Sequence, residues 1–283
     1  MTAVPAVFFI FLKMKNVTLQ ELLEVGAHFG HQVNRWNPKM EPYIYAAREG
    51  VHIFDLAKTK EGLEKAGEFL KAVAGKEGVV LWVGTKRQAQ GFIKETAVSL
   101  GHPYICQRWI GGLLTNFGQV KKSVDRLRDL KEKKASGELT KYTKKENLLI
   151  DREIARLEKF FGGLASLTKL PDVLVVVDTH REKTAVSEAR RVGIPVVGLI
   201  DTNSDPTMVS YGIPANDDAV KSIEFVIGYL SSAIAEGKGH PVKDKEMEKV
   251  EKVEEKAEED GEEKTKKRGR PVKKDLPKEE KTA

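Results

Sequence analysis

Two apolar runs, Pro171-Asp-Val-Leu-Val-Val-Val-Asp178 and Ile194-Pro-Val-Val-Gly-Leu-Ile-Asp-Thr-Asn-Ser-Asp-Pro206, decide the fold of this chain. Consecutive apolar positions are typical of a parallel strand that helices cover on both faces. The segment between the runs, 184–191, has the length of a crossover helix, so the three parts predict a βαβ unit. Ligands bind at the carboxyl edge of such sheets, but the polar residues found there are expected to form turns by bonding local amides. These residues are Asp178, Asp201, Asn203 and Asp205.

Further strands and helices extend this unit toward the N-terminus. The apolar run 79–83 is predicted to be a strand, because it lies between two helical patterns at 60–76 and 88–100. The alternation of strands and helices predicts an α/β fold in which helices cover a parallel sheet. The other elements predicted are a β-hairpin with arms 43–45 and 51–54, a short β segment at 104–105 and a last helix at 218–236.

The region 116–164 breaks this alternation with two long helical patterns, joined near Gly137. Each pattern has an apolar seam with the spacing of coiled-coil packing, which predicts an antiparallel helical (coiled-coil) hairpin that protrudes from the sheet. The seams are Val120, Val124, Leu127 and Leu130, and Ile150, Ile154, Leu157, Phe161 and Leu164. The outer faces carry Lys121, Lys122, Arg126, Arg128, Lys131, Lys133, Lys134, Lys141, Lys144 and Lys145.

Composition divides the chain into four parts. The apolar run at 6–12 is too short to span a bilayer and lacks the positive flank of a signal peptide, so 1–15 is predicted to be a disordered leader. Met14 is an alternative start, because a helix capping box follows it at 18–21. Lysine and glutamate dominate 237–283, which is predicted to be a disordered charged tail. The α/β domain is expected at 16–115 and 165–236, with the hairpin at 116–164.

A nucleotide site is the first functional alternative. Val83-Gly-Thr-Lys-Arg87 leaves a predicted strand and enters a helix, as a phosphate loop does, but it lacks the GxxxxGK[ST] spacing, and the chain has no GxGxxG fingerprint. A doubly wound enzyme that binds a nucleotide through Gly84–Arg87 and Asp201 is therefore the rival interpretation, and it would show saturable nucleotide binding. Lys86 and Arg87, at a helix N-terminus, could instead contact a backbone phosphate of a nucleic acid.

Metal and catalytic constellations are not predicted. His28 and His31 are three residues apart near a turn, but no cysteine or carboxylate beside them completes a metal site, so local packing is expected. His180 stands near Asp178 without a serine or cysteine nucleophile at a strained turn. Cys106 is the only cysteine, which excludes an internal disulfide and favours a buried structural thiol in a reducing compartment. We expect no cofactor, no metal and no catalytic residue.

Two arginine–tryptophan pairs, Arg35-Trp36 and Arg108-Trp109, combine a guanidinium with an aromatic ring, and Asn116 ends a glycine-containing stretch that follows the second pair. Such pairs can contact phosphate and stack on a base. They can equally have their tryptophans in the core and their arginines on its rim. The residues alone leave both interpretations open.

The tail contains a basic run, Lys266-Lys-Arg-Gly-Arg-Pro-Val-Lys-Lys274, in a chain of net charge +6. Its Arg-Gly-Arg-Pro core resembles an A·T-hook, which lies in a narrow minor groove of DNA. Electrostatic adhesion to RNA is the preferred use, and a DNA-binding protein led by this tail is the third alternative. The contact residues would be Lys267, Arg268 and Arg270.

Six motifs occur in one order along the chain and together resemble bacterial small-subunit ribosomal protein S2, of the universal uS2 family. The likeness covers about 16–236. The motifs are Gly26-Ala-His-Phe-Gly-His31, Arg35-Trp-Asn-Pro-Lys-Met40, Gly50-Val-His-Ile-Phe-Asp-Leu56, Trp109-Ile-Gly-Gly-Leu-Leu-Thr-Asn116, 197–206 and Ile213-Pro-Ala-Asn-Asp-Asp218.

The resemblance implies a flavodoxin-like or Rossmann-like doubly wound parallel sheet with a protruding helical hairpin. It implies a non-catalytic, structural constituent of the small ribosomal subunit in the cytoplasm. The chain would bind small-subunit rRNA near the junction of head and body, lie beside neighbouring ribosomal proteins and help to dock ribosomal protein S1 for translation. A membrane partner and a homo-oligomer are not expected. The residues expected to contact rRNA are Arg35, Trp36, Lys39, Lys86, Arg87, Arg108, Trp109, Asn116, Lys121, Lys122, Arg126, Lys144 and Lys145.

Overall fold

A computed structural model describes residues 17–239, apart from the side chain of Thr140. The predicted leader at 1–15 lies outside the described residues, as does the predicted tail from residue 240 onward with Lys267, Arg268 and Arg270. Within the described range, no helix is both long enough and apolar enough to cross a membrane.

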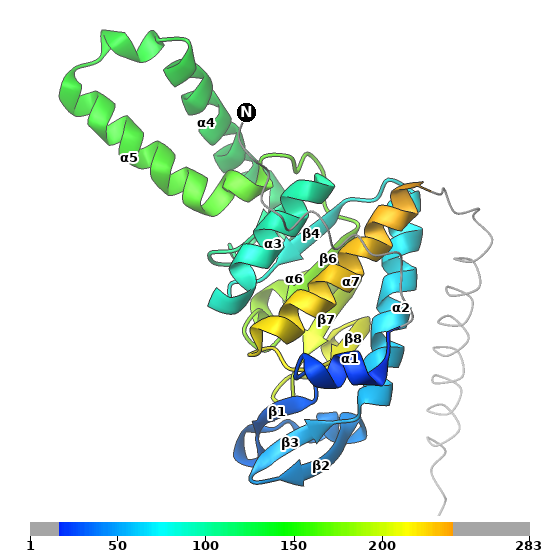
Figure 1. Ribbon diagram of the computed structural model, residues 1–283. Helices are drawn as coiled ribbons and strands as arrows, with labels where there is room; N and C mark the ends of the chain where they lie inside the picture. Colours follow the sequence, from blue (N-terminus) through cyan, green and yellow to red (C-terminus); the bar gives the residue numbers. More distant parts are fainter. Residues whose placement is uncertain (1–16, 240–283) are drawn as a thin grey trace, which may run out of the picture. The chain divides into compact units, whose positions relative to one another are not determined.

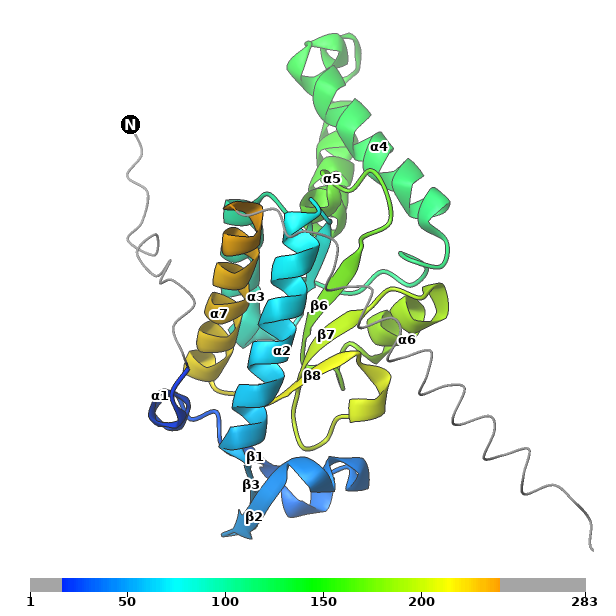
Figure 2. The same ribbon diagram turned by 90° about the vertical axis from the view of Figure 1, so that its right-hand side faces the viewer.

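Five parallel strands form the central sheet, in the order β5-β4-β6-β7-β8 (Figures 1 and 2). Every residue of β4, β6 and β7 is buried, which explains the continuous apolar runs from which they were predicted. The α/β fold with a helix-covered parallel sheet is therefore confirmed. The sequence analysis missed β8. The strands are β4 (Val80–Val83), β5 (Tyr104–Ile105), β6 (Val173–Val177), β7 (Val196–Ile200) and β8 (Tyr211–Pro214).

Helices cover both faces of this sheet, as Figure 2 shows. Because successive strand residues point to opposite faces, Leu174 and Val176 pack with Val186 of α6, whereas Val173 and Val175 belong to the other core cluster. That second cluster contains side chains from α2, α3 and α7, together with Leu22 of the first helix of the chain. The helices are α2 (Leu56–Gly75), α3 (Arg87–Leu100), α6 (Lys183–Val192) and α7 (Val220–Gly239).

A small antiparallel sheet of order β1-β3-β2 precedes the central one. Its β2–β3 hairpin was predicted, and Glu49 and Gly50 join the arms with positive φ angles of 51° and 77°. Thr18 and Glu21 form the predicted capping box at the start of the first helix. These elements are α1 (Leu19–Glu24), β1 (Phe29–Gln32), β2 (Ile44–Arg48) and β3 (Val51–Phe54), with 3-10 turns at Val33–Arg35 and Pro38–Tyr43.

Two long helices, α4 (Phe117–Ala135) and α5 (Lys144–Phe161), occupy the region between β5 and β6. Leu127 of α4 packs with Ile154 and Leu157 of α5 in a small core of their own, and Figure 1 shows the two helices side by side. A 3-10 turn, η4 (Glu138–Lys141), joins them after Gly137, whose φ is +76°. A second capping box, from Thr143 and Glu146, begins α5. The other 3-10 turns are η5 (Gly162–Leu164) and η6 (Pro206–Met208).

Candidate functional site

The carboxyl edge of the central sheet holds a buried ionic cluster around Lys86. The Lys86 Nζ atom lies 2.6 Å from Asp217 Oδ1, 2.6 Å from Asp218 Oδ1 and 3.6 Å from Asp178 Oδ2. Burial lowers the pKa of Lys86, but the attraction and hydrogen bonds of the aspartates outweigh burial and leave the pKa raised. The lysine is only 8% exposed, so the phosphate contact expected from the sequence is not available to it. Arg87, by contrast, is exposed at the start of α3.

His31 lies in the same region and is surrounded by carboxylates. Its Nδ1 atom is 2.9 Å from Asp201 Oδ1, and its Nε2 atom is 3.7 Å from Asp218 Oδ2. The hydrogen bond that the ring donates to the Asp201 carboxylate, with the charges of the neighbouring aspartates, raises the pKa of His31 against the effect of burial. The expectation that no carboxylate stands beside His31 is therefore wrong. The reason is that the fold brings β1 to the end of β7.

Three of these residues have the arrangement of metal ligands. One ligand atom each from His31, Asp201 and Asp217 lies within 4.8 Å of the other two, and both aspartates are fully buried. Asp217 Oδ2 has no hydrogen-bond partner within the described residues. Burial and the charges of Asp201 and Asp178 raise the pKa of Asp217 to about 8, against the opposing effect of the Lys86 ammonium group. Imidazole and carboxylate are ligands that suit a divalent ion such as zinc.

The remaining polar residues of this edge form turns. Asp178 has a φ of +64° and accepts a hydrogen bond from the Arg181 amide at 2.9 Å. Asp201 accepts from the Thr202 amide, and Asp205 accepts from the Thr207 amide. These contacts confirm the prediction of turn-forming aspartates. Asn203 differs, because its Nδ2 atom lies 3.4 Å from His31 Nε2 and contacts no local amide.

Glu188 of α6 organises the loop that leads into α4, and the sequence analysis missed it. Its carboxylate accepts hydrogen bonds from Trp109 Nε1 at 3.0 Å and from the Gly112 amide at 2.8 Å. It also accepts from the amides of Leu114 and Thr115, at 3.2 and 3.3 Å, and from the Thr115 hydroxyl at 3.2 Å. Burial raises the pKa of Glu188, but these hydrogen bonds outweigh it and leave the pKa lowered. The carboxylate is therefore held in its charged form.

Trp109 is consequently a structural residue. It is 8% exposed, it packs in the core cluster beneath α6, and its indole N–H is bonded to Glu188. In this conformation its ring is not available to stack on a base. Of the two interpretations of the Arg108-Trp109 pair, the structure therefore favours a tryptophan in the core. Arg108, the other member, is exposed at the rim. Asn116, at the N-terminus of α4, is exposed as well.

The Arg35-Trp36 pair lies on the turn after β1. Arg35 is exposed, whereas Trp36 is half-buried with its ring centroid 5.1 Å from that of His52. Lys39, nearby in sequence, forms an ion pair of 2.6 Å with Asp205. Arg35 is thus the member of this group that remains available to a phosphate.

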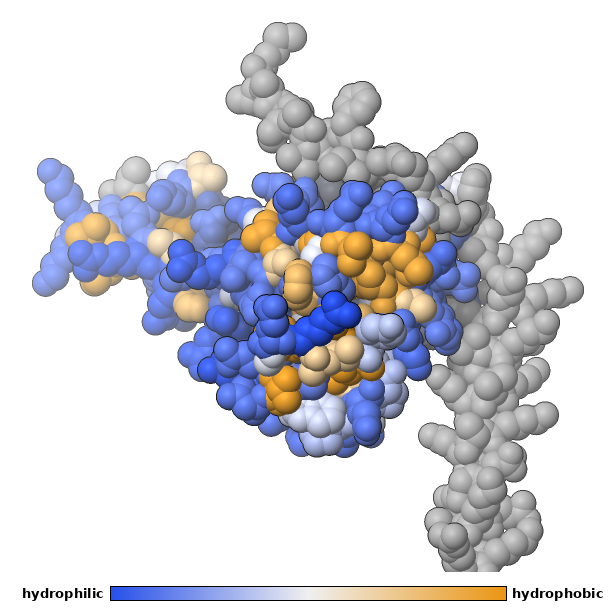
Figure 3. Space-filling model, turned by 60° about the horizontal axis from the view of Figure 1, so that its bottom comes forward, coloured by the Kyte–Doolittle hydropathy of each residue, from blue (hydrophilic) through white to orange (hydrophobic). Residues whose placement is uncertain are grey.

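The α4–α5 region carries five of the thirteen residues that were predicted to contact rRNA. Lys121, Lys122, Lys144 and Lys145 are exposed, and Figure 3 shows this part of the surface, at the left, as mainly hydrophilic. Arg126 is exposed too, but its Nη2 atom lies 2.8 Å from Glu153 Oε1 of α5. Arg126 therefore helps to hold the two helices together.

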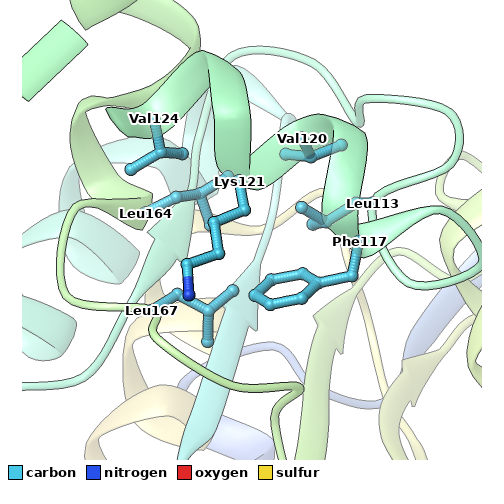
Figure 4. Close-up of a pocket in the computed structure, with 7 residues that line it drawn as sticks. All are labelled: Leu113, Phe117, Val120, Lys121, Val124, Leu164 and Leu167. Carbon is cyan, nitrogen blue, oxygen red and sulfur yellow. The ribbon is translucent and has the colours of Figure 1, made fainter. Parts of the chain in front are cut away.

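A small hollow lies at the foot of α4 (Figure 4). The hollow is shallow and open to solvent, and the side chain of Lys121 lies across it. The rest of the lining is apolar, so the hollow offers no set of polar groups that would orient a nucleotide. The lining residues are Leu113, Phe117, Val120, Lys121, Val124, Leu164 and Leu167.

Known proteins resemble almost the whole described part of the chain. The family profile for ribosomal protein S2 matches residues 22–237. Small ribosomal subunit protein uS2 of Microcystis aeruginosa is 48% identical over 225 residues, which cover 80% of this chain and 85% of that protein. The uS2 proteins of a Synechocystis species and a Roseiflexus species are 48% and 49% identical over 229 and 221 residues, covering 81% and 78% of this chain and 85% and 84% of theirs. The family inferred from the six motifs is confirmed, and the chain belongs to the ribosomal protein S2 family.

Proposed function

We propose that this chain is a structural, non-catalytic protein of the small ribosomal subunit in the cytoplasm, where it binds small-subunit rRNA. The observation that carries the proposal is the family match, which spans residues 22–237 and so includes both the sheet and the α4–α5 region. A degenerate nucleotide-type fold suits this role, because recognition by charge and shape needs no active site.

The proposed roles of the parts of the chain follow the domains expected from the sequence. Residues 16–115 and 165–236 form the α/β body, and 116–164 form a hairpin that protrudes from it as an RNA-binding arm. The arm is held together by its own small core, so it can present cations on its outer faces. Phosphate contacts by these cations would release counterions and make binding sensitive to salt. No role is proposed for the leader at 1–15 or for the tail at 237–283.

The candidate contacts are those cations and polar side chains that are exposed. Lys86 and Trp109 are omitted because both are buried and bonded within the protein. Lys39 and Arg126 are kept as secondary candidates, since each must share its charge with an acidic partner, and Trp36 is half-buried. The primary candidates are Arg35, Arg87, Arg108, Asn116, Lys121, Lys122, Lys144 and Lys145.

Protein partners are proposed on the resemblance to uS2. They are the neighbouring proteins of the small subunit and ribosomal protein S1, whose docking the chain would help. The chain would act as one copy per subunit and not as a homo-oligomer.

An enzyme remains the competing class, and the geometry of the sheet edge supports it poorly. The residues that would have to bind a nucleotide, Lys86 and Asp201, are both buried and bonded to other side chains or amides. Thr85 of the same loop donates a 2.5 Å hydrogen bond to Glu182, so its hydroxyl is also occupied. Saturable nucleotide binding by the purified protein would nevertheless favour the enzyme.

Charge reversal at Lys121 and Lys122 is expected to lower the share of the protein that sediments with small subunits by about tenfold. Each exposed lysine that contacts phosphate contributes roughly 1 kcal/mol, and reversal adds repulsion to that loss. The measurement is a sucrose gradient of gently lysed cells expressing tagged Lys121→Glu/Lys122→Glu protein. Arg126 is left intact because its replacement would also break the ion pair with Glu153.

The matched control reverses two lysines of the α/β body, Lys60 and Lys65, which pair with Glu64 and Glu61 on the surface of α2. The control has the same change in net charge, so it should sediment like wild type. Equal sedimentation of the wild type and the Lys121→Glu/Lys122→Glu protein would contradict these contacts. Wild-type protein found free of ribosomal particles would contradict the proposed function itself.

A further inference from the structure

The charges of the α4–α5 region are sorted between two faces. Three acids of α5 pair with cations of α4: Asp151 with Lys134 at 2.6 Å, Glu153 with Arg126 at 2.8 Å and Glu158 with Lys131 at 2.7 Å. The fourth, Glu146, is bonded to the amide and hydroxyl of Thr143 in the capping box. Every acidic side chain of α5 is thus engaged, either with α4 or with the cap.

The cations of α5 have no such partners. Lys145, Arg152 and Arg156 are exposed, and within residues 17–239 none of the three has an ion-pair partner. With 3.6 residues per turn, positions 145, 149, 152 and 156 fall on one face of the helix, opposite the buried Ile154 and Leu157. This face, defined by Lys145, Leu148, Leu149, Arg152 and Arg156, is called the outer face of α5 below.

Two leucines interrupt the cations on this face. Leu148 is 51% exposed and Leu149 is 54% exposed, which is unusual for adjacent leucines in the middle of a charged helix surface. The outer face therefore has an apolar centre. Lys145 lies on the N-terminal side of this centre, and Arg152 and Arg156 lie on its C-terminal side.

We propose that the outer face of α5 binds double-stranded RNA along its minor groove. The inference rests on the proposed function and names the surface that performs it. Lys145, Arg152 and Arg156 contact phosphates, and the leucines pack against the riboses between them. From residue 145 to residue 156 the helix rises about 16 Å, which is long enough to reach across a groove from one phosphate row to the other.

Two observations favour a duplex over other partners. The minor groove of duplex RNA is wide and shallow and is recognised by phosphate and ribose contacts, which match cations and leucines. Single-stranded RNA is usually held by stacking on aromatic rings, and the outer face contains none. A neighbouring protein could cover the leucines, but it would have to supply carboxylates for three cations in addition.

The test uses the full chain and a transcript of small-subunit rRNA from the same source, titrated at several salt concentrations. Arg152→Ala/Arg156→Ala is expected to weaken binding at least tenfold and to reduce the slope of log K against log salt by about 2, because two phosphate contacts are lost. The control Lys131→Ala/Lys134→Ala removes the same charge from residues that pair with Glu158 and Asp151 within the protein, and its slope should equal that of wild type. Circular dichroism checks that each variant keeps its helices.

A second variant, Leu148→Ser/Leu149→Ser, examines the apolar centre. It is expected to weaken binding about tenfold at every salt concentration with an unchanged slope. An RNA duplex should displace the transcript from wild type, whereas DNA of the same sequence should not, because it lacks the 2′-hydroxyl groups and the A-form groove.

The outcomes separate this inference from the proposed function. A wild-type slope in the Arg152→Ala/Arg156→Ala protein would overturn the inference while leaving rRNA binding by another surface intact. Normal binding of naked rRNA by the leucine variant, together with loss from assembled subunits, would also overturn it and assign the face to a protein partner. Failure of the wild type to bind the transcript or enter subunits would contradict the proposed function instead.

Discussion

Replacing Glu188 with alanine is expected to lower the free energy of unfolding by at least about 3 kcal/mol. The change leaves the indole N–H of Trp109 and three amides of the loop, at positions 112, 114 and 115, without their acceptor. An unsatisfied buried donor costs about 1–3 kcal/mol, and water can reach only part of this site because Trp109 and Leu114 are buried. Urea denaturation followed by circular dichroism measures the loss.

The effect should extend to α4, because residues 109–116 lead directly into it. A loosened loop no longer fixes the start of the helix, so the Glu188→Ala protein should also enter small subunits less efficiently at temperatures where it remains folded. Ser187→Ala on the same helix is the matched control. Its hydroxyl bonds only the Lys183 carbonyl on the surface, and its stability should stay within about 0.5 kcal/mol of wild type.

The pH dependence of this effect has a definite sign. The pKa of Glu188 is lowered in the folded protein, so its contribution to stability is fully present above the ordinary value of 4.5 and is lost as the pH falls through the lower, folded pKa. The difference between wild type and Glu188→Gln, which cannot ionise, should therefore shrink below about pH 4. A difference that stays constant down to acid pH would show that the charge of Glu188 is not what holds the loop.

The sequence predicted the central sheet because its signals are local. Apolar runs at 173–177 and 196–200 mark buried strands without reference to any other part of the chain, and the capping boxes at Thr18 and Thr143 mark two helix starts. Strand β1 was missed because it has four residues, no fully buried side chain and a shifted register against β3. Strand β8 was missed because it contains a glycine and ends in a proline, both poor signals for a strand.

The site residues were less predictable because their partners are distant in sequence. Trp109 and Glu188 are 79 residues apart, and Lys86 and Asp217 are 131 apart, so neither pairing leaves a local pattern. A lysine at a helix start and an arginine–tryptophan pair suggest nucleic-acid binding when read alone, yet the fold uses Lys86 and Trp109 internally. Among the exposed cations of α5, the sequence analysis proposed Lys144 and Lys145, which adjoin the cap, as contacts. Arg152 and Arg156 were overlooked among acids that pair with α4.

Replacing Lys86 with methionine is expected to destabilise the chain by about 3–5 kcal/mol, the usual effect of removing one partner from a buried ion pair. Methionine fills a similar volume, so the loss reports charge and not a cavity. Asp178 and Asp217 would be left as buried carboxylates without their cation, and Asp218 would lose a 2.6 Å contact. Thermal and urea unfolding measure the change, with Arg87→Met, an exposed cation of the same helix, as the control.

A second substitution distinguishes an unpaired charge from lost packing. Adding Asp217→Asn to Lys86→Met replaces one of the unpaired carboxylates by a neutral side chain of the same shape. The double variant should therefore be more stable than Lys86→Met alone by about 1–3 kcal/mol. If the asparagine change only adds to the damage, the lysine acts through its aliphatic chain and not through its charge. The expected recovery would show that a lysine at the end of β4, where nucleotide-binding folds hold phosphate, here neutralises the protein's own aspartates.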